Sequence, residues 1–196
     1  MLTLDDFDFD LPETLIALRP LKPRPASRML VSENGITDAH VSDLPSLLQP
    51  GDLLVFNNTK VIPARLTGER RRQTDSGSGI AKIEATLIER TGVGSWVALA
   101  KPAKRLTPGD TITFSDRLTA EVTHKDGGEV SLQFNLTGGE LDQEIQSTGD
   151  MPLPPYIAAK RSADAADKED YQTVFARQIG AVAAPTASLH FDLQAH

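Results

Sequence analysis

Six short segments between residues 62 and 135 alternate apolar and polar side chains, and this pattern constrains the fold more than any other feature. They are IPARLTGER, KIEATLIER, SWVALAKPA, DTITFSD, LTAEVTHKD and EVSLQFN. A period of two residues is typical of strands with one buried face, and turns rich in Gly, Asp and Ser separate the segments. We therefore predict a small antiparallel β-barrel or sandwich, with its most flexible turn at TDSGSG, residues 74–79.

The sequence on either side of this region has a mixed α/β pattern. We predict short helices over 12–18, within 41–49 and over 140–149, a strand over 28–31, a turn at Asn34–Gly35 and a weakly helical segment over 161–178. The apolar run 53–56 is typical of a central strand covered on both faces, and the prolines of 151–156 predict a rigid connector. The predicted fold is an α/β domain, residues 1–62 and 154–196, that carries an inserted antiparallel β-barrel domain, residues 63–153.

Composition narrows the chemistry. The chain has no cysteine, which excludes a disulfide framework, a zinc–thiolate site and a thiol nucleophile. Its four histidines lack the spacing of metal ligands, so no metal is expected. No apolar run approaches the length of a membrane span, and the acidic N-terminus lacks the pattern of a secretory signal. We expect a cytoplasmic protein without a membrane partner.

Basic residues are unevenly distributed along the chain. The formal net charge is −7, yet ten of the twenty Lys and Arg lie within residues 60–105. Screening at physiological salt limits charge effects to about 8 Å, so a local positive patch meets a phosphate backbone even on an acidic protein. The alternative is a solvated charged loop around Arg70–Arg72.

Polar side chains follow the predicted strand 53–56. Asn57, Asn58 and Thr59 offer amide and hydroxyl groups, and Lys60 and Arg65 suit a carboxylate or phosphate. Ligands of open α/β sheets bind at the carboxyl ends of strands, so these residues are candidate ligand contacts. The alternative is that the two asparagines form a turn between domains.

Two further stretches are candidates for binding or catalysis. Tyr156 and Tyr171 are the only tyrosines, and each suits stacking on a base or ribose, although simple packing is the alternative. Near the end of the sequence, Thr186, Ser188 and His190 share one side if the backbone is extended. Such a row suits proton transfer or ligand orientation, and the alternative is a satisfied histidine in a core segment.

These stretches together resemble the S-adenosylmethionine:tRNA ribosyltransferase-isomerase family of queuosine biosynthesis. The family motif Phe-Asn-(Asp/Asn)-Thr-(Arg/Lys)-Val-Ile-Pro-Ala-Arg-Leu is similar to residues 56–66, and Met-Pro-Leu-Pro-Pro-Tyr-Ile matches residues 151–157. Tyr-Gln-Thr-Val matches residues 171–174, and Gly-Ala-Val-Ala-Ala-Pro-Thr-Ala-Gly-Leu-His-Phe matches residues 180–191 except at Ser188. The resemblance spans the chain in order.

The resemblance implies a function. Members of the family transfer the ribosyl unit of S-adenosylmethionine to 7-aminomethyl-7-deazaguanine at the tRNA wobble position and isomerise it, which gives epoxyqueuosine and releases adenine and methionine. S-adenosylmethionine is then a consumed substrate, and no cofactor is expected. This chemistry needs a general acid/base, and His190 is the candidate.

The resemblance also assigns binding roles. Asn57, Asn58 and Thr59 would orient ribose hydroxyls or the methionine part, with Lys60 or Arg65 near a carboxylate or phosphate. Tyr156 or Tyr171 would stack on the deazaguanine. Thr186 and Ser188 would line the same site, and the basic stretch 60–105 would follow the anticodon stem. The expected partners are tRNA and S-adenosylmethionine, and a monomer is expected.

Two departures from the family pattern bear on activity. Residue 188 is Ser where the family has Gly, and a Cβ there would narrow the site or distort a turn. Family members also continue through further motifs that these 196 residues do not match. The alternatives to an active enzyme are a non-catalytic RNA-binding module that keeps the barrel and an inactive fragment.

Overall fold

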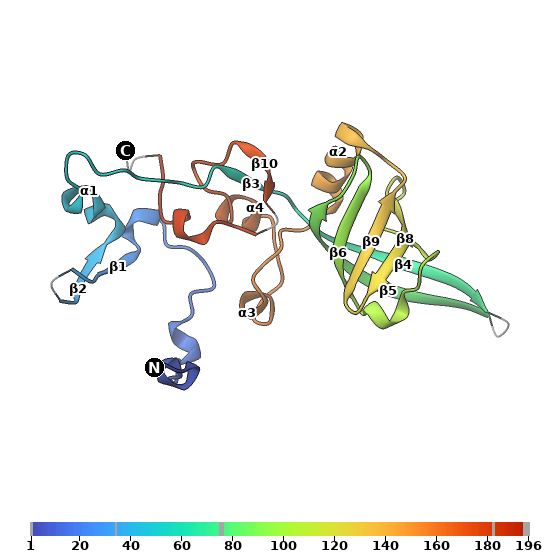
Figure 1. The fold of residues 1–196 in the computed structure, drawn as a ribbon, viewed down its shortest axis with the longest axis horizontal. Coiled ribbons are helices and arrows are strands. Elements are labelled where there is room, and N and C mark those ends of the chain that lie inside the picture. Colours follow the sequence, from blue (N-terminus) through green and yellow to red (C-terminus); the bar gives the residue numbers. More distant parts are fainter. Residues whose placement is uncertain (1, 34, 75–76, 182, 194–196) are drawn as a thin grey trace. The chain divides into compact units, whose positions relative to one another are not determined.

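The computed structural model of the protein describes residues 2–33, 35–74, 77–181 and 183–193. These residues form two compact units, Met1–Asp52 with His190–His196 and Leu53–Leu189. Figure 1 shows the elements of both units along the chain. The predicted domain boundaries, 1–62 with 154–196 and 63–153, stay a prediction.

The first unit consists of short elements. They are the 3-10 helices η1 (Leu4–Phe7), η2 (Glu13–Leu15), η3 (Arg24–Ala26) and η4 (Val41–Asp43), the strands β1 (Arg28–Val31) and β2 (Thr37–His40), and the helix α1 (Leu44–Leu47). The predicted strand 28–31 is confirmed as β1, and it forms an antiparallel hairpin with β2. Of the predicted turn between them, Gly35 has a φ of +124°, whereas Asn34 lies outside the described residues.

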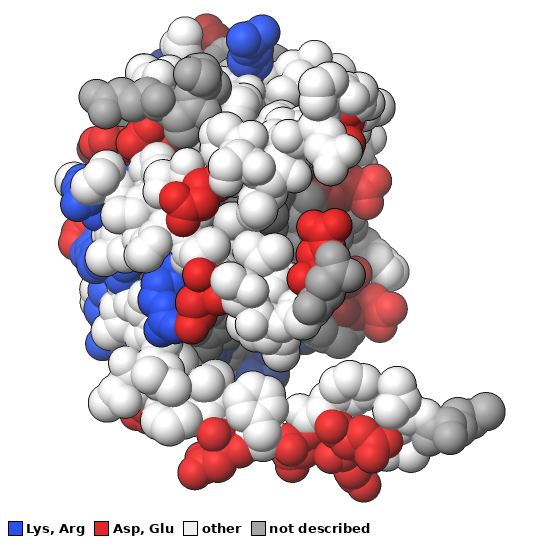
Figure 2. Space-filling view, turned by 90° about the vertical axis from the view of Figure 1, so that its left-hand side faces the viewer, with Lys and Arg blue, Asp and Glu red and all other residues white. Residues whose placement is uncertain are grey.

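Burial in this unit is low. None of the described residues before position 53 is fully buried, so they form no closed core by themselves. Acidic side chains follow the N-terminal segment at the bottom of the view in Figure 2, where η1 contains Asp5 and Asp6. The predicted helix over 12–18 is shorter than expected, because only the 3-10 turn η2 forms after Pro12.

The six predicted strands are confirmed, and they close into an antiparallel barrel. They are β4 (Arg65–Thr74), β5 (Gly77–Arg90), β6 (Ser95–Lys101), β7 (Thr111–Thr113), β8 (Thr119–Asp126) and β9 (Glu129–Phe134), with the 3-10 helix η5 (Ala103–Arg105) after β6. The order around the barrel is β4-β5-β6-β9-β8-β7, and β7 pairs with β4 to close it. Closure protects the strand edges, which is how small β folds avoid edge-to-edge association.

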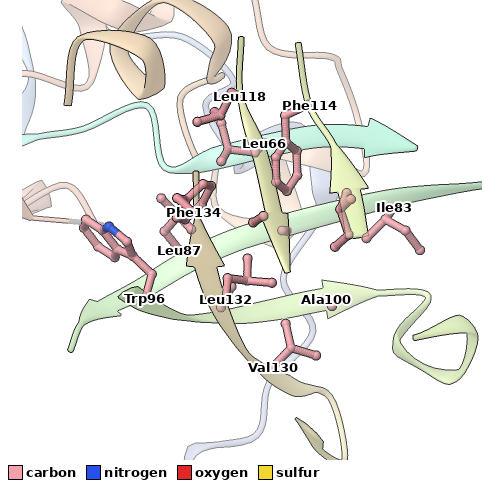
Figure 3. Packing of buried hydrophobic residues seen from close by; sticks show 14 of the residues in the cluster. Leu66, Ile83, Leu87, Trp96, Ala100, Phe114, Leu118, Val130, Leu132 and Phe134 are labelled. Atoms are coloured by element: carbon pink, nitrogen blue, oxygen red, sulfur yellow. The ribbon is translucent and has the colours of Figure 1, made fainter. Parts of the chain in front are cut away.

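The alternating pattern explains the barrel core. On β6 every second residue is buried, and Trp96, Ala98 and Ala100 point inward. Figure 3 shows Leu66, Ile83, Leu87, Phe114, Leu118, Val130, Leu132 and Phe134 packed around the same interior. The predicted turn at 74–79 lies at the end of the β4–β5 hairpin, where Thr74 and Gly77–Gly79 still pair, and its flexibility stays a prediction. Asp75 and Ser76 lie outside the described residues.

Two strands that flank the barrel in the sequence form a parallel pair. Strand β3 (Thr59–Val61) precedes the barrel and β10 (Gln178–Ala181) follows it, yet the two pair in parallel. The chain between them contains the barrel and the helices α2 (Gly138–Thr148), α3 (Pro155–Ala158) and α4 (Asp167–Asp170), and the 3-10 helix η6 (Thr186–Ser188) comes after β10. The predicted fold class, an α/β arrangement with an inserted antiparallel barrel, is confirmed.

The predicted buried strand 53–56 is wrong. Residues 52–58 have no regular secondary structure, and Leu53 and Val55 are 84% and 85% exposed. An apolar run becomes a central strand only where neighbouring strands and covering layers meet it, and no described segment pairs with this one. Phe56, at the end of the run, stacks on Phe175 with ring centroids 4.2 Å apart.

The helical predictions after the barrel have mixed outcomes. The helix predicted over 140–149 is confirmed as α2, which buries Leu141 and Ile145 against the barrel. Of the predicted weakly helical segment 161–178, only α4 is helical among the described residues. The predicted connector 151–156 is irregular up to Pro154, and then α3 begins at Pro155.

Candidate functional site

A cleft of about 510 Å³ lies in the unit Leu53–Leu189, where barrel, helix and parallel strands meet. Ile62, which follows the end of β3, and Ile179 and Gly180 of β10 line one part of it. In α/β structures the carboxyl ends of parallel strands are the usual place for ligands, and clefts of this size hold drug-sized molecules. This cleft is therefore the candidate functional site.

A β-bulge brings three consecutive residues of β5 into the cleft wall. Ile88, Glu89 and Arg90 all line the cleft, although neighbours on a regular strand point to opposite faces. The pairing of β5 with β6 shifts by one residue between Leu87 and Glu89, and such bulges redirect side chains. Strand β10 has a similar shift, between Ile179 and Ala181, at the same cleft.

Glycine makes the second irregularity possible. Gly180 has a φ of +152°, a conformation that residues with a Cβ seldom adopt. The residue lies between the two register positions of the β3–β10 shift and lines the cleft. The first residue of the predicted motif 180–191 therefore has a conformational reason to be Gly.

Helix α2 presents one face to the cleft. Asp142, Ile145 and Gln146 line it, as expected of residues spaced three and four apart on a helix. The end of the helix lies against the β3–β4 connection. The approach is so close that a Cβ on Gly149 would lie 1.9 Å from the carbonyl oxygen of Pro63. Gly149 thus fixes how closely the helix approaches the cleft wall.

Charged and aromatic groups meet at the cleft wall between β5 and α2. Arg90 pairs with Asp142, and its guanidinium lies 4.8 Å from the centroid of the Trp96 ring. The side chain of Trp96 is almost fully buried, and its Nε1–H has no acceptor among the described residues. Since Asp142 neutralises Arg90, the Glu89 carboxylate gives the cleft a negative character.

The structure gives the Asn57–Lys60 stretch a turn geometry at the start of β3. The Asn57 side-chain oxygen accepts hydrogen bonds from the Thr59 N–H at 2.8 Å and the Thr59 hydroxyl at 2.6 Å. The Asn58 carbonyl accepts from the backbone N–H groups of Arg177 and Gln178, which leads into the β3–β10 pairing. Lys60 is exposed on β3. These residues lie at the amino end of β3, whereas the cleft lies beyond its carboxyl end.

Arg65 begins β4 and is half-buried. Its backbone N–H donates to the Asp150 carbonyl at 3.2 Å, and its carbonyl accepts from the Asp150 N–H at 2.9 Å. This bridge joins the beginning of the barrel to the segment after α2.

The two tyrosines occupy different environments. Tyr156 lies in α3 and is 56% exposed, whereas Tyr171 follows α4 and is half-buried. In α4, Asp167 is fully buried and accepts two hydrogen bonds from Arg161, at 2.8 and 2.6 Å. These bonds raise the pKa of Arg161, with a smaller contribution from Tyr171. Neither tyrosine lines the cleft.

Gln172 extends the β3 strand by side-chain hydrogen bonds. Its Oε1 accepts from the Val61 N–H at 3.0 Å, and its Nε2 donates to the Val61 carbonyl at 2.6 Å. The motif 171–174 is thereby fixed to the strand that leads into the cleft. No local pattern in the sequence indicates this role of Gln172, because its partner lies 111 residues away.

The expected row of Thr186, Ser188 and His190 is not formed. Thr186–Ser188 is the 3-10 helix η6, in which every third residue aligns, so the extended alternation does not apply. Thr186 is exposed and Ser188 is buried, in a helical conformation that accommodates a Cβ. His190 is exposed and belongs to the other unit.

Of the residues that line the cleft, only Ile62 and Gly180 belong to the motifs that the sequence indicated, residues 56–66 and 180–191. Trp96 is the single tryptophan of the chain, and its presence was a signal by which this part of the cleft could have been found. The alternation of residues 82–90 breaks where the apolar Leu87 and Ile88 are adjacent, and the register shift of β5 lies at this point, so the break was a second available signal.

In the part of the chain that the structure describes, no group of three or more His, Cys, Asp or Glu is arranged to hold a metal ion. Over the same residues, no helix has the length and apolar character needed to cross a membrane.

Comparisons with known proteins agree on one family. Residues 4–196 match the family described as "Queuosine biosynthesis protein". The chain is 58% identical over 190 residues to an S-adenosylmethionine:tRNA ribosyltransferase-isomerase of Ruegeria pomeroyi and to one of Cereibacter sphaeroides. Each match covers 96% of this chain and 54% of the relative, so the chain spans about half the length of these relatives.

A solved structure is also similar. The crystal structure of S-adenosylmethionine tRNA ribosyltransferase from Thermotoga maritima is 32% identical, with a TM-score of 0.35. The match covers 79% of this chain and 53% of that one.

Proposed function

The chain belongs to the family of queuosine biosynthesis proteins, and from this membership we propose that it takes part in S-adenosylmethionine:tRNA ribosyltransferase-isomerase activity. The observation that carries the proposal is the 58% identity, across 96% of the chain, to relatives that bear this name. In the proposed reaction the ribosyl unit of S-adenosylmethionine moves to 7-aminomethyl-7-deazaguanine at the tRNA wobble position and isomerises to give epoxyqueuosine. Adenine and methionine leave.

The proposed partners follow from the reaction. They are S-adenosylmethionine, consumed as a substrate, and tRNA, bound through its anticodon stem-loop. We propose that the protein needs no further cofactor or metal, acts as a monomer and works in the cytoplasm, where tRNA is available.

The reaction needs a proton to be removed beside a sulfonium and a proton to reach the departing adenine. His190 is the proposed general acid/base, since its imidazole is exposed and an imidazole can both accept and donate a proton. The exposed Lys60 and the half-buried Arg65 are the proposed contacts for an anionic group of the substrates.

The other proposed contacts differ in which side-chain groups are available to a ligand. Asn57 already accepts two hydrogen bonds through its side-chain oxygen, which leaves its amide N–H₂ for a ligand. The exposed Tyr156 is better placed to stack on a base than the half-buried Tyr171.

The proposal is tested by transfer of label. The 196-residue chain would be incubated with S-adenosylmethionine labelled in its ribose and with tRNA that bears the aminomethyl base. Label in the tRNA is the expected result. Binding of tRNA without label indicates a non-catalytic RNA-binding module, and the absence of both indicates an inactive fragment; either outcome contradicts the proposal for this chain.

Two histidine variants test the proposed role of His190 as general acid/base. His190→Ala is expected to lower ribosyl transfer by about a hundredfold or more, as loss of a general acid/base does, and to leave tRNA binding unchanged. His124→Ala is the matched control, because His124 is exposed on β8 of the barrel. Equal transfer rates for the two variants would remove His190 from the mechanism.

A further inference from the structure

The cleft between β5, α2 and β10 has a composition that selects a particular class of ligand. Isoleucines from three elements, Ile88, Ile145 and Ile179, line it together with Trp96. Flat aliphatic and aromatic surfaces of this kind bury a planar ring system. A volume of about 510 Å³ accommodates a fused-ring base with an attached group.

The charges of the cleft disfavour a phosphate and favour a cation. Among the described residues of the lining, Arg90 is the one cationic side chain, and Asp142 pairs with it. Glu89 also lines the cleft, and no ion pair joins it to any described residue. One carboxylate is therefore left without a countercharge at the edge of an apolar surface, where a positive group on a ligand would be stabilised.

A buried donor in the wall also lacks a partner. Trp96 is 4% exposed, and its Nε1–H meets no acceptor within the described residues. Buried donors are nearly always satisfied, and an unsatisfied one beside a cleft points to an acceptor that arrives with a ligand. Ring nitrogens and carbonyl oxygens of a nucleobase are acceptors of this kind.

The backbone around the cleft departs from regular strand geometry at two places. Both register shifts described above, in β5 and in β10, lie on its wall. Bulges occur preferentially beside functional sites because they redirect side chains out of the regular alternation. Here the bulge of β5 is what brings Glu89 to the same surface as Ile88.

We propose that this cleft binds a ligand that combines a fused-ring nucleobase with a positive group, and that Glu89 is the counter-ion of that group. Two ligands of the proposed function share this chemistry, the sulfonium of S-adenosylmethionine and the aminomethyl-deazaguanine of the tRNA, so the choice of ligand rests on that function. Gln146, whose amide both donates and accepts, contacts the edge of the base.

The single tryptophan makes the test direct, because emission excited at the indole reports only on Trp96. The 196-residue chain would be titrated with two matched pairs of probes. One pair is S-adenosylmethionine and its neutral thioether S-adenosylhomocysteine, and the other is 7-aminomethyl-7-deazaguanine and the neutral 7-methyl compound. We expect a saturable change in emission with the cationic member of one pair, and that pair identifies the ligand.

Substitutions test whether the carboxylate of Glu89 is the group that binds the cationic probe. Glu89→Gln is expected to weaken binding of the cationic probe about tenfold and to leave the neutral probe unchanged, as removal of one charge-assisted hydrogen bond predicts. Glu84→Gln is the matched control, since Glu84 lies on the same strand outside the cleft. Thermal unfolding would verify that both variants fold. If Glu89→Gln does not fold, Gln146→Ala tests the cleft instead: it is expected to weaken binding of both members of the pair, and the exposed Gln143→Ala on α2 is its control.

Two outcomes would overturn the proposal: no saturable change in Trp96 emission with either pair, or equal affinities of the wild type and Glu89→Gln for the cationic probe. The ribosyl-transfer assay separates this inference from the proposed function. A saturable emission change without transfer of label keeps the cleft and contradicts the function for this chain. Transfer of label without any emission change does the reverse.

Discussion

Asp110 is the residue on which the polar contacts at the β4–β7 side of the barrel converge. Its carboxylate accepts hydrogen bonds from Arg72 at 2.7 Å and from the Thr107 N–H at 2.8 Å, and Arg70 Nε lies 4.0 Å away. Burial raises the pKa of Asp110, but the hydrogen bonds from Arg72 and Thr107 outweigh it and lower the pKa below 3.8. The ionised carboxylate therefore stabilises the fold.

Asp110→Asn is expected to destabilise the protein by about 2 kcal/mol near neutral pH, because two buried or half-buried arginines lose their countercharge. The folded pKa lies below the unfolded value, so the contribution of Asp110 is present above 3.8 and is lost as the pH falls through the folded pKa. The difference between wild type and variant should accordingly stay constant from neutral pH down to about pH 5 and shrink as the pH falls below 3.8 in urea unfolding.

Asp116→Asn serves as the control for this series, because Asp116 is exposed on the β7–β8 connection. It is expected to leave the free energy of unfolding unchanged within about 0.5 kcal/mol, as surface substitutions do. A difference for Asp110→Asn that stays constant across the pH range would show that the carboxylate stabilises the fold by packing alone.

At the scale of single residues, the sequence identified polar side chains but not their partners. Asn57 and Thr59 were expected to hydrogen-bond a ligand, which stays a prediction, and the structure shows them bonded to each other in a turn. The contacts of Asp110 join residues 38 apart, and those of Gln172 join residues 111 apart. Long-range partners of this kind depend on the tertiary fold, which no local pattern encodes.

At the scale of elements, helix α2 owes its position to a glycine at its end. A Cβ on Gly149 would lie 1.9 Å from the Pro63 carbonyl oxygen and 2.8 Å from that of Ile145, and both are backbone atoms that cannot turn away. Gly149→Ala is expected to destabilise the protein by about 2–3 kcal/mol, because the helix must move away from the barrel. Chemical denaturation measures the decrease.

Gly139→Ala is the matched control within the same helix. A Cβ on Gly139 meets nothing within 4 Å, and the residue does not have a positive φ. Its replacement is expected to be neutral or to stabilise by about 0.5 kcal/mol, because alanine favours helix. Equal decreases for the two variants would contradict the assignment of the effect to the close approach at Pro63.

The elements that could be predicted from the sequence are strands that pair with segments adjacent to them in the sequence. The barrel strands pair mainly with adjacent segments, as in β8 and β9, and their alternation was sufficient to predict them. The run 53–56 was predicted as a buried strand from apolarity alone, but burial requires partners elsewhere in the fold, and Leu53 and Val55 are exposed. The β3–β10 pair joins segments on opposite sides of the barrel sequence, so its register was not predictable.

At the scale of the whole molecule, the structure divides the basic stretch 60–105 into two classes. Arg70 and Arg72 face Asp110, Arg71 pairs with Glu69, and Arg90 pairs with Asp142. No ion pair joins the remaining basic residues of the stretch to described residues: Lys60, Arg65, Lys82, Lys101, Lys104 and Arg105. The predicted positive surface is thus carried by fewer charges than the sequence contains.

Lys104 and Arg105 are the strongest candidates for contact with the phosphate backbone of the proposed tRNA partner. Both are exposed on η5, and the buried Arg70 fixes this helix by donating to the Arg105 carbonyl at 2.8 Å. Lys125 donates to the next carbonyl, that of Leu106, at 3.0 Å. Two cations on a fixed backbone lose little entropy on binding a phosphate, so they should contribute strongly to affinity.

The double variant Lys104→Ala, Arg105→Ala is therefore expected to weaken binding of an anticodon stem-loop and to lower the slope of log affinity against log salt by about 1 to 2, since each phosphate that is no longer neutralised removes about one. Arg117→Ala is the control, because Arg117 lies outside the stretch and 3.9 Å from the Glu144 carboxylate. Fluorescence anisotropy at several salt concentrations gives both slopes. An unchanged slope in the double variant would place the RNA on another face of the molecule, since counterion release counts the phosphates that the protein neutralises whatever the RNA sequence.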